Sequence, residues 1–176
     1  MSKPGSTEEK PLVVVVMGVS GSGKTTVARI LAARMGWVLE EGDALHSLSN
    51  IEKMRAGSPL TDADRQDWLL RVADWVDERL DDLQNGVITC SALKRSYRNL
   101  INRRGSGVVF VFLAGAKTTI AQRLVARQGH FMPPTLLDSQ LAALEEPEPD
   151  EPAIRIDVGG SPEVIAQRVL DELRLG

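Results

Sequence analysis

The sequence predicts a doubly wound α/β domain with three layers, in which a five-stranded parallel sheet lies between helices. Two observations indicate this class. Short apolar runs rich in β-branched residues alternate along the 176-residue chain with longer segments of helical period. Two of these runs, residues 12–17 and 108–113, are almost wholly apolar, which is typical of parallel strands that helices cover on both faces.

Five apolar runs are expected to form the strands, and seven segments of helical period the helices. The strands are predicted at residues 12–17, 37–39, 86–90, 108–113 and 153–158. The helices are predicted at residues 24–35, 50–55, 62–83, 96–102, 116–127, 134–144 and 162–173. In the third helix, apolar side chains recur at intervals of three and four residues and form an inward stripe. The stripe consists of Trp68, Val72, Trp75, Val76 and Leu83, and we interpret its tryptophans as core residues rather than as a ligand platform.

Composition limits the choice of partners and location. One domain is expected at residues 12–176, after a polar, disordered tail at residues 1–11, and the acidic, proline-rich segment 145–152 favours a solvated loop. The net charge of −3 gives no overall attraction for nucleic acid or for an anionic membrane, so an anionic substrate requires a local cluster of Lys and Arg. The single cysteine, Cys90, and the lack of an apolar signal-peptide core favour a cytoplasmic protein.

The segment GVSGSGKT, residues 18–25, matches the phosphate-binding pattern G-x-x-x-x-G-K-S/T between a predicted strand and a predicted helix. Glycines permit backbone angles closed to other residues, so that amide N–H groups can approach phosphate oxygens. In this pattern Lys24 contacts the β- and γ-phosphates, and the Thr25 hydroxyl is a ligand of Mg²⁺. The predicted ATP-binding residues are Gly18, Val19, Ser20, Gly21, Ser22, Gly23, Lys24, Thr25 and Thr26.

The receiver of the phosphate must be inferred from other segments. Switch GTPases and motor ATPases usually carry an aspartate at the end of an apolar strand. In this chain the third predicted strand ends with Cys90 and Ser91 in that place. The sequence also contains no N-K-x-D pattern for guanine. Small-molecule kinases of this fold often have an acidic residue after the second strand, where this chain has Asp43. A small-molecule kinase is therefore favoured.

Three segments should meet beyond the carboxyl ends of the strands, where α/β sheets bind ligands. They are GDALH after the second strand, CSALKRSYR after the third, and RLVARQGHF after the fifth long helix. Their candidate site residues are Asp43, His46, Lys94, Arg98, Arg123, Arg127 and His130. Each of the two histidines is either a substrate-binding or a structural residue on this reasoning.

At these positions the chain resembles gluconokinases of the bacterial thermoresistant type. The resemblance covers about residues 13–157 and depends on MGVSGSGKTT, GDALHSLSNIEKMRAGSPLTDADRQDWL, CSALKRSYR and RQGHFMPPTLLDSQLAALEEP. It implies a P-loop kinase fold similar to shikimate and nucleoside monophosphate kinases, transfer of the γ-phosphoryl group of ATP to gluconate, and a homodimer. Ser47 is a departure, because the family usually has proline after the pair LH.

Gluconate is a small polyhydroxylated anion, so its site needs a carboxylate clamp. Arg65 and Arg98 are the predicted clamp, with Lys94 in support, because arginine holds a carboxylate in two parallel hydrogen bonds. The alternative for Arg65 is an ion pair with Asp62 on an exposed helix face. Asp43 is expected to orient the acceptor hydroxyl and to take its proton late in the transfer.

Residues 123–135 are predicted to form a short lid, because a kinase must keep water away from the transferred phosphoryl group. Arg127 and, second to it, Arg123 are expected to neutralise charge on that group. An ordinary connection between two helices is the alternative.

Two other functions fit parts of the pattern. One is another kinase of the same fold, acting on shikimate, a nucleotide or adenylyl sulfate. The other is a nucleotide-binding regulator or ATPase with no small acceptor. Cys90 is interpreted as a packing residue rather than a nucleophile, because in-line transfer needs no covalent intermediate.

Overall fold

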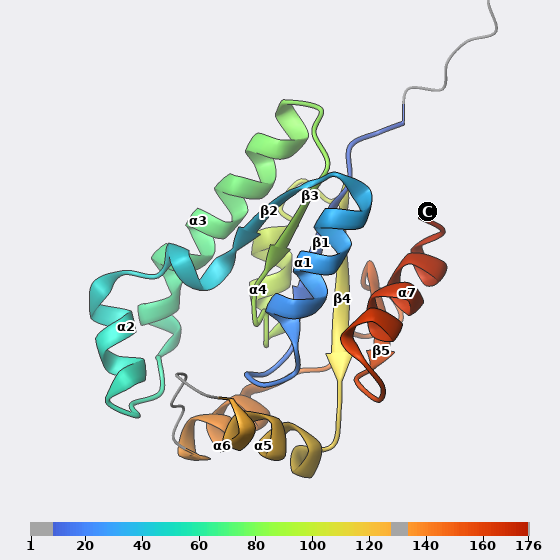
Figure 1. Cartoon of the computed structure of the whole chain (residues 1–176). Helices are drawn as coiled ribbons and strands as arrows, with labels where there is room; N and C mark the ends of the chain where they lie inside the picture. Colours follow the sequence, from blue (N-terminus) through green and yellow to red (C-terminus); the bar gives the residue numbers. More distant parts are fainter. Residues whose placement is uncertain (1–8, 128–133, 176) are drawn as a thin grey trace, which may run out of the picture.

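A computed structural model, which describes residues 9–127 and 134–175, confirms the three-layer α/β fold. Five parallel strands form one sheet in the order β2-β3-β1-β4-β5 (Figure 1). The strands are β1 (Val13–Met17), β2 (Val38–Glu41), β3 (Gly86–Thr89), β4 (Val108–Ala114) and β5 (Ala153–Asp157). The central strand β1 therefore ends between β3 and β4, and the phosphate-binding segment follows it directly.

Helices cover both faces of the sheet, as the apolar strands predict. On one face lie α1 (Lys24–Met35) and α7 (Pro162–Leu173), and on the other α3 (Asp62–Asp81) and α4 (Arg95–Ile101) (Figure 1). Successive side chains of a strand point to opposite faces. Val14 and Val16 of β1 accordingly lie in the α1–α7 core, and Val13 and Val15 lie in the α3–α4 core.

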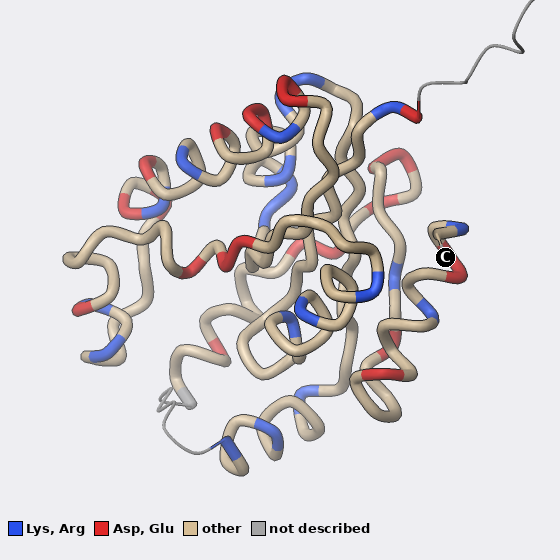
Figure 2. The backbone as a smooth tube through the Cα atoms, turned by 45° about the horizontal axis from the view of Figure 1, so that its top comes forward, with Lys and Arg blue, Asp and Glu red and all other residues tan. Residues whose placement is uncertain are grey.

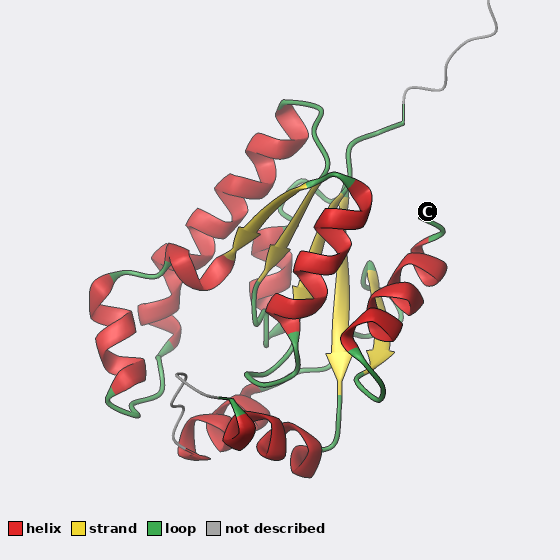
Figure 3. Ribbon diagram, in the orientation of Figure 1, coloured by secondary structure: helices red, strands yellow, loops and turns green. Residues whose placement is uncertain are grey.

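The remaining helices lie beyond the carboxyl ends of the strands (Figure 3). They are the 3₁₀ helix η1 (Gly42–Leu45), α2 (Leu48–Arg55), α5 (Lys117–Ala126) and α6 (Pro134–Ala143). The sequence did not predict η1, and α2 begins two residues before the predicted position because the Ser47 Oγ accepts a hydrogen bond from the Asn50 N–H at 3.2 Å. Ser47 thus forms an N-cap where the family usually has proline.

The inward stripe of α3 is confirmed for four of its five members and wrong for the last. Trp68, Val72 and Val76 are buried, and Trp75 packs against the same core. Leu83 lies beyond the end of the helix, has a left-handed backbone (φ 55°) and is 77% exposed. The helix ends at Asp81, so the helical spacing no longer directs the Leu83 side chain inward.

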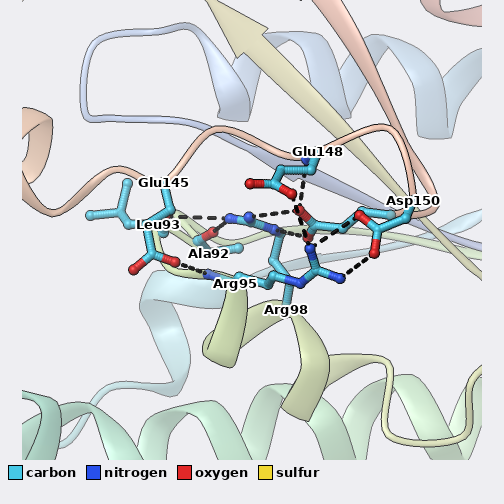
Figure 4. Close-up of polar contacts among 8 residues, drawn as sticks. Ala92, Leu93, Arg95, Arg98, Glu145, Glu148 and Asp150 are labelled. Carbon is cyan, nitrogen blue, oxygen red and sulfur yellow. Dashed lines mark hydrogen bonds and ion pairs between the residues drawn. The ribbon is translucent and has the colours of Figure 1, made fainter.

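The acidic segment 145–152, here called the acidic strap, is a mostly exposed loop, as predicted, but it is also tied to α4 by its carboxylates. Its two ends are bound to α4: the Glu145 carboxylate accepts a hydrogen bond from the Arg95 N–H at 2.9 Å, and the Glu151 carboxylate pairs with Arg98 at 2.7 Å. Figure 4 shows the Arg95 and Arg98 side chains beside Glu148 and Asp150 of the strap. Composition could not predict this contact, because the complementary arginines lie about fifty residues earlier in the chain.

Several predictions concern residues outside the described ranges. Residues 1–8 of the predicted tail and 128–133 of the predicted lid, which include His130, are among them. The division into a tail, one domain and a lid therefore stays a prediction. Across the described residues, no helix combines the length and the apolar composition needed to cross a bilayer.

Candidate active site

The phosphate-binding segment forms a tight loop between β1 and α1 that depends on three glycines. Gly18, Gly21 and Gly23 have φ values of 144°, 82° and 96°, which other residues rarely adopt. A Cβ atom on Gly18 would lie 2.8 Å from Ser22 Oγ and 3.0 Å from the Leu113 carbonyl oxygen. The tight shape of the loop at the amino end of α1 therefore requires glycine at these positions.

Lys24 lies inside this loop. Its ammonium group donates hydrogen bonds to the Gly18 and Val19 carbonyl oxygens at 3.0 and 3.1 Å. Burial lowers the pKa of Lys24, and the nearby Asp43 carboxylate opposes that shift. The Val19 side chain is buried, so this residue can offer a ligand only its backbone.

Three features of the loop are of a kind that suits a polyphosphate and a hard metal ion. The glycine backbone leaves no room for a Cβ at Gly18, and the buried Ser22 Oγ has no hydrogen-bond partner among the described residues. Thr25, the second residue of α1, places a hydroxyl at the positive end of that helix. A hydroxyl oxygen and phosphate oxygens are ligands of the kind that Mg²⁺ prefers.

A hollow beside the loop, here called the acceptor hollow, brings together residues from six parts of the chain. The phosphate loop contributes Ser20 and Lys24, η1 and its C-cap contribute Asp43 and His46, and α3 contributes Arg65 and Trp68. The remaining lining residues are Met54, Pro59, Leu60, Ser91, Leu93, Leu136, Ser139 and Gln140. The structure thus brings five predicted site residues, Ser20, Lys24, Asp43, His46 and Arg65, to one place.

Asp43 is held in this hollow by contacts of the residue before it. The Gly42 N–H donates to Thr89 Oγ1 at 3.2 Å, and the Gly42 carbonyl accepts from Trp68 Nε1 at 2.7 Å. A Cβ atom on Gly42 would overlap the Thr89 carbonyl oxygen. The turn after β2 therefore packs directly on the end of β3, which fixes the start of η1 and Asp43 with it.

His46 lies where either of the two roles that the sequence left open, structural or substrate-binding, is possible. Its ring stacks on Trp68 with the centroids 4.1 Å apart and the planes 17° from parallel, and it also lines the hollow. Burial lowers the pKa of His46 to about 4, and Asp43 only partly offsets this effect. The imidazole is therefore a neutral hydrogen-bonding group at neutral pH.

Arg65 does not form the direct ion pair with Asp62 that was its alternative role. Its Nη1 donates to the Tyr97 hydroxyl at 3.1 Å, and this hydroxyl in turn donates to Asp62. Lys94 pairs with Asp62 at 3.1 Å and does not line the acceptor hollow. Tyr97 thus connects Arg65 to the Lys94–Asp62 pair, and Arg65 alone of the three basic residues predicted to hold the acceptor carboxylate faces the hollow.

The predicted role of Arg98 as a carboxylate clamp needs correction. The side chain is 1% exposed, and its Nε and Nη2 donate to the Glu151 carboxylate at 2.7 and 3.1 Å. Its Nη1 donates to the carbonyl oxygens of Ala92 and Leu93. Each guanidinium nitrogen is therefore engaged within the protein, and the substrate-like carboxylate that Arg98 binds is Glu151 of the acidic strap.

Arg123 and Arg127 lie on the other side of the phosphate loop, in a second hollow with Gly21, Gly23 and Thr26. Arg123 donates to the Val158 carbonyl oxygen at 2.6 Å. Figure 2 shows basic but no acidic positions along α5, which ends just before Arg127. The structure thus places these arginines beside the loop but not in the acceptor hollow with Asp43.

Sequence reasoning missed Gln140 of α6, which touches the phosphate loop. The Ser20 N–H donates to Gln140 Oε1 at 2.7 Å, and both residues line the acceptor hollow. Gln140 lies in one of the segments that resemble gluconokinases, but no spacing rule distinguishes it from its neighbours. Only the packing of α6 against the loop, 120 residues away in sequence, shows its position.

Cys90 is a packing residue, as predicted. It is 1% exposed, and burial raises the pKa of its thiol to about 12, so the reactive thiolate is disfavoured. A surface hollow of about 880 Å³ lies apart from this site between β5 and α7, and it is lined mainly by charged residues such as Arg155, Arg168 and Glu172. It contains none of the predicted site residues.

Comparisons of the sequence and the fold with known proteins identify similar kinases. A family model described as an AAA domain matches residues 13–147. The chain is 50% identical over 161 residues to a gluconokinase of Gluconobacter oxydans, covering 92% of this chain and 90% of that protein. It is similar to a solved sugar kinase of Janibacter (47% identity, TM-score 0.87, 94% and 96% of the two chains) and to a solved gluconokinase of Sinorhizobium meliloti (43%, TM-score 0.84, 94% and 93%).

Proposed function

The chain belongs to the gluconokinase family, and from this premise we propose how its residues transfer the γ-phosphoryl group of ATP to gluconate to give 6-phosphogluconate. One observation carries the proposal. Lys24 of the phosphate loop and Asp43, the candidate acceptor-orienting carboxylate, line the same hollow. A phosphoryl group held by the loop and a hydroxyl held by Asp43 would therefore face each other without intervening backbone.

On the donor side, the loop amides and Lys24 bind the β- and γ-phosphates. Phosphoryl transfer has a loose transition state, so positioning and neutralisation of charge supply most of the catalysis. Mg²⁺, held by the Thr25 hydroxyl together with phosphate oxygens, supplies further neutralisation when bound. Arg123 and Arg127 flank the loop at Gly21 and Gly23, which supports a role on the nucleotide side.

On the acceptor side, Asp43 orients the hydroxyl that attacks the γ-phosphorus and accepts its proton as the new bond forms. A carboxylate is too weak a base to ionise an alcohol beforehand, so orientation is its main contribution. Arg65 binds the gluconate carboxylate, and its contact with the Tyr97 hydroxyl at 3.1 Å holds the guanidinium in place. His46 offers a neutral hydrogen-bonding group to the hydroxyls.

Water is the competing acceptor, and we propose that residues 123–135 close over the site to exclude it. The described ends of this segment support the idea. Arg127 lies beside the phosphate loop, and α6, which begins at Pro134 near the end of the segment, contributes Leu136, Ser139 and Gln140 to the acceptor hollow. Movement of the segment between them would therefore act on both substrates.

Assembly and location are further parts of the proposal. The resemblance to the family supports a homodimer, which light scattering of the purified protein tests directly. The single, buried Cys90 suits the reducing cytoplasm, where a free thiol persists.

ADP release in a coupled assay tests the function. The assay compares gluconate with shikimate, a nucleoside monophosphate and adenylyl sulfate, and includes a reaction without acceptor. ADP release that depends on gluconate is the expected result. Release that is equal without any acceptor would identify an ATPase, and release that depends on another acceptor would identify a different kinase.

A further inference from the structure

Asn50 is a buried polar residue of α2 that has no role in the mechanism described above. Its side chain makes two contacts through one atom. Nδ2 donates to the Asp64 carbonyl oxygen at 2.7 Å, and the same nitrogen lies 3.3 Å from Nδ1 of His46. The residue is 5% exposed although α2 is a short helix with an otherwise open surface.

The Asp64 carbonyl determines which way the Asn50 amide faces. A carbonyl oxygen can only accept a hydrogen bond, so the amide nitrogen and not the amide oxygen must lie against it. The amide carries two hydrogens, and one of them is used by Asp64. The second is available to the His46 ring.

The second hydrogen determines the tautomer of His46. Because Asn50 Nδ2 donates, His46 Nδ1 must accept with its lone pair. A neutral imidazole carries a single hydrogen, which must then be on Nε2. The charged form would place a second hydrogen on Nδ1, directly against the amide donor.

The surroundings of His46 support the neutral form. Burial lowers the pKa of His46 to about 4; the nearby charges act in both directions, since Asp43 raises the pKa while Arg65 and Arg71 lower it. The stacked Trp68 ring fixes the imidazole plane. The position of the one hydrogen is therefore the remaining variable, and the Asn50 amide sets it.

We propose that Asn50 is a positioning residue that holds His46 as the Nε2–H tautomer, so that His46 donates a hydrogen bond to an oxygen of the acceptor. This rests on the proposed function, because the donor matters only if the acceptor occupies the hollow that His46 lines. The opposite tautomer would present a lone pair there. A lone pair repels a carboxylate or a hydroxyl oxygen that needs a donor, so the arrangement selects oxygen-rich anionic acceptors.

Nitrogen-15 NMR of the imidazole rings tests the tautomer without any substrate. The chain has two histidines, so a His130→Asn variant leaves His46 as the single signal. In this otherwise unmodified protein we expect a protonated Nε2 and an unprotonated Nδ1 at pH 7. A protonated Nδ1 would overturn the proposal, whatever the enzyme's activity. Because this measurement needs no acceptor, it stays interpretable if gluconate proves to be the wrong one.

Kinetics of Asn50→Ala test the consequence. We expect its nitrogen-15 spectrum to show a mixture of His46 tautomers. The gluconate KM should rise about tenfold, because the loss of one well-placed hydrogen bond has about this effect, and the KM for ATP should stay unchanged. Ser47→Ala is the matched control, because it removes the side-chain cap of the Asn50 backbone N–H at the start of α2 but leaves the Asn50 side-chain amide in the protein. The control should lower stability without changing the gluconate KM. Equal effects of both variants on that KM would reduce Asn50 to a structural residue and overturn the proposal.

Discussion

Arg98→Met is expected to destabilise the protein strongly, because it breaks a buried ion pair. The Arg98 and Glu151 side chains are 1% and 5% exposed, and two hydrogen bonds join them at 2.7 and 3.1 Å. Methionine fills much of the same volume but donates no hydrogen bond. The Glu151 carboxylate would stay buried without its cation, and the Ala92 carbonyl oxygen would lose its donor at 2.9 Å.

The expected cost follows from these losses. Removing one partner of a buried ion pair costs about 3–5 kcal/mol, because the other charge is left uncompensated. For a chain of this size, 1 kcal/mol lowers Tm by about 2–4 °C, so a fall of about 10 °C is expected. Replacing both partners by apolar residues, as in Arg98→Met with Glu151→Leu, removes the uncompensated charge and should restore part of that loss.

Thermal unfolding followed by circular dichroism measures these values. Arg29→Met is the matched control, because Arg29 pairs with Glu41 at 2.9 Å and both side chains are exposed, at 66% and 37%. An exposed pair contributes about 1 kcal/mol at most, so the control should change Tm by no more than about 4 °C. Similar Tm values for the two single variants would refute the view that the strap is held by a buried pair.

Four further predictions concern the site and the strap. Lys24→Ala should abolish turnover with an unchanged circular dichroism spectrum, and near-normal turnover would remove Lys24 from the mechanism. Asp43→Asn should lower kcat by about 10²-fold or more while the KM for ATP changes little, since the carboxylate acts on the acceptor; equal effects on both constants would argue against this. Arg65→Ala should raise the gluconate KM by about tenfold or more, because the loss of a charge-assisted hydrogen bond has an effect of this size. An unchanged gluconate KM would mean that Arg65 contacts Tyr97 but not the substrate. Burial alone would raise the pKa of Glu151, but the hydrogen bonds from Arg98 and from the Glu148 N–H, with the charges of Arg98 and Arg95, outweigh it and lower the pKa below its usual 4.5. The carboxylate therefore stabilises the fold above that pH, and the stability difference between wild type and Glu151→Gln should shrink as the pH falls through the lowered value; a difference that is constant down to acid pH would contradict this.

The sequence allowed most of the fold to be predicted, because its signals are local. The valine run of β1, the glycines of the loop and the apolar period of α3 each act within a few residues of chain. Element ends were less accurate where a specific contact overrides the pattern. Residues Glu40 and Glu41 are polar, yet they extend β2 because their backbones pair with Ile88 and Thr89 of β3.

The site was predicted in part, and its failures have a common cause. Asp43, His46 and Arg65 were found because they lie near strand ends or in specific motifs, and they do meet Lys24 in the acceptor hollow. Arg98 was assigned to the substrate carboxylate because a guanidinium group binds carboxylates well, but the carboxylate that it binds is that of Glu151 in the same chain. Residue type predicts what a side chain can bind, whereas the partner depends on which distant segment packs there.

The ratio of products tests most directly whether the loop and the acceptor hollow act together. Phosphorus NMR of a reaction with ATP and gluconate measures ADP, inorganic phosphate and the phosphorylated sugar acid at once. One phosphogluconate for each ADP, with no inorganic phosphate above the background, is the predicted result. Inorganic phosphate that accumulates in step with ADP would mean that water receives the phosphoryl group, and it would contradict the account.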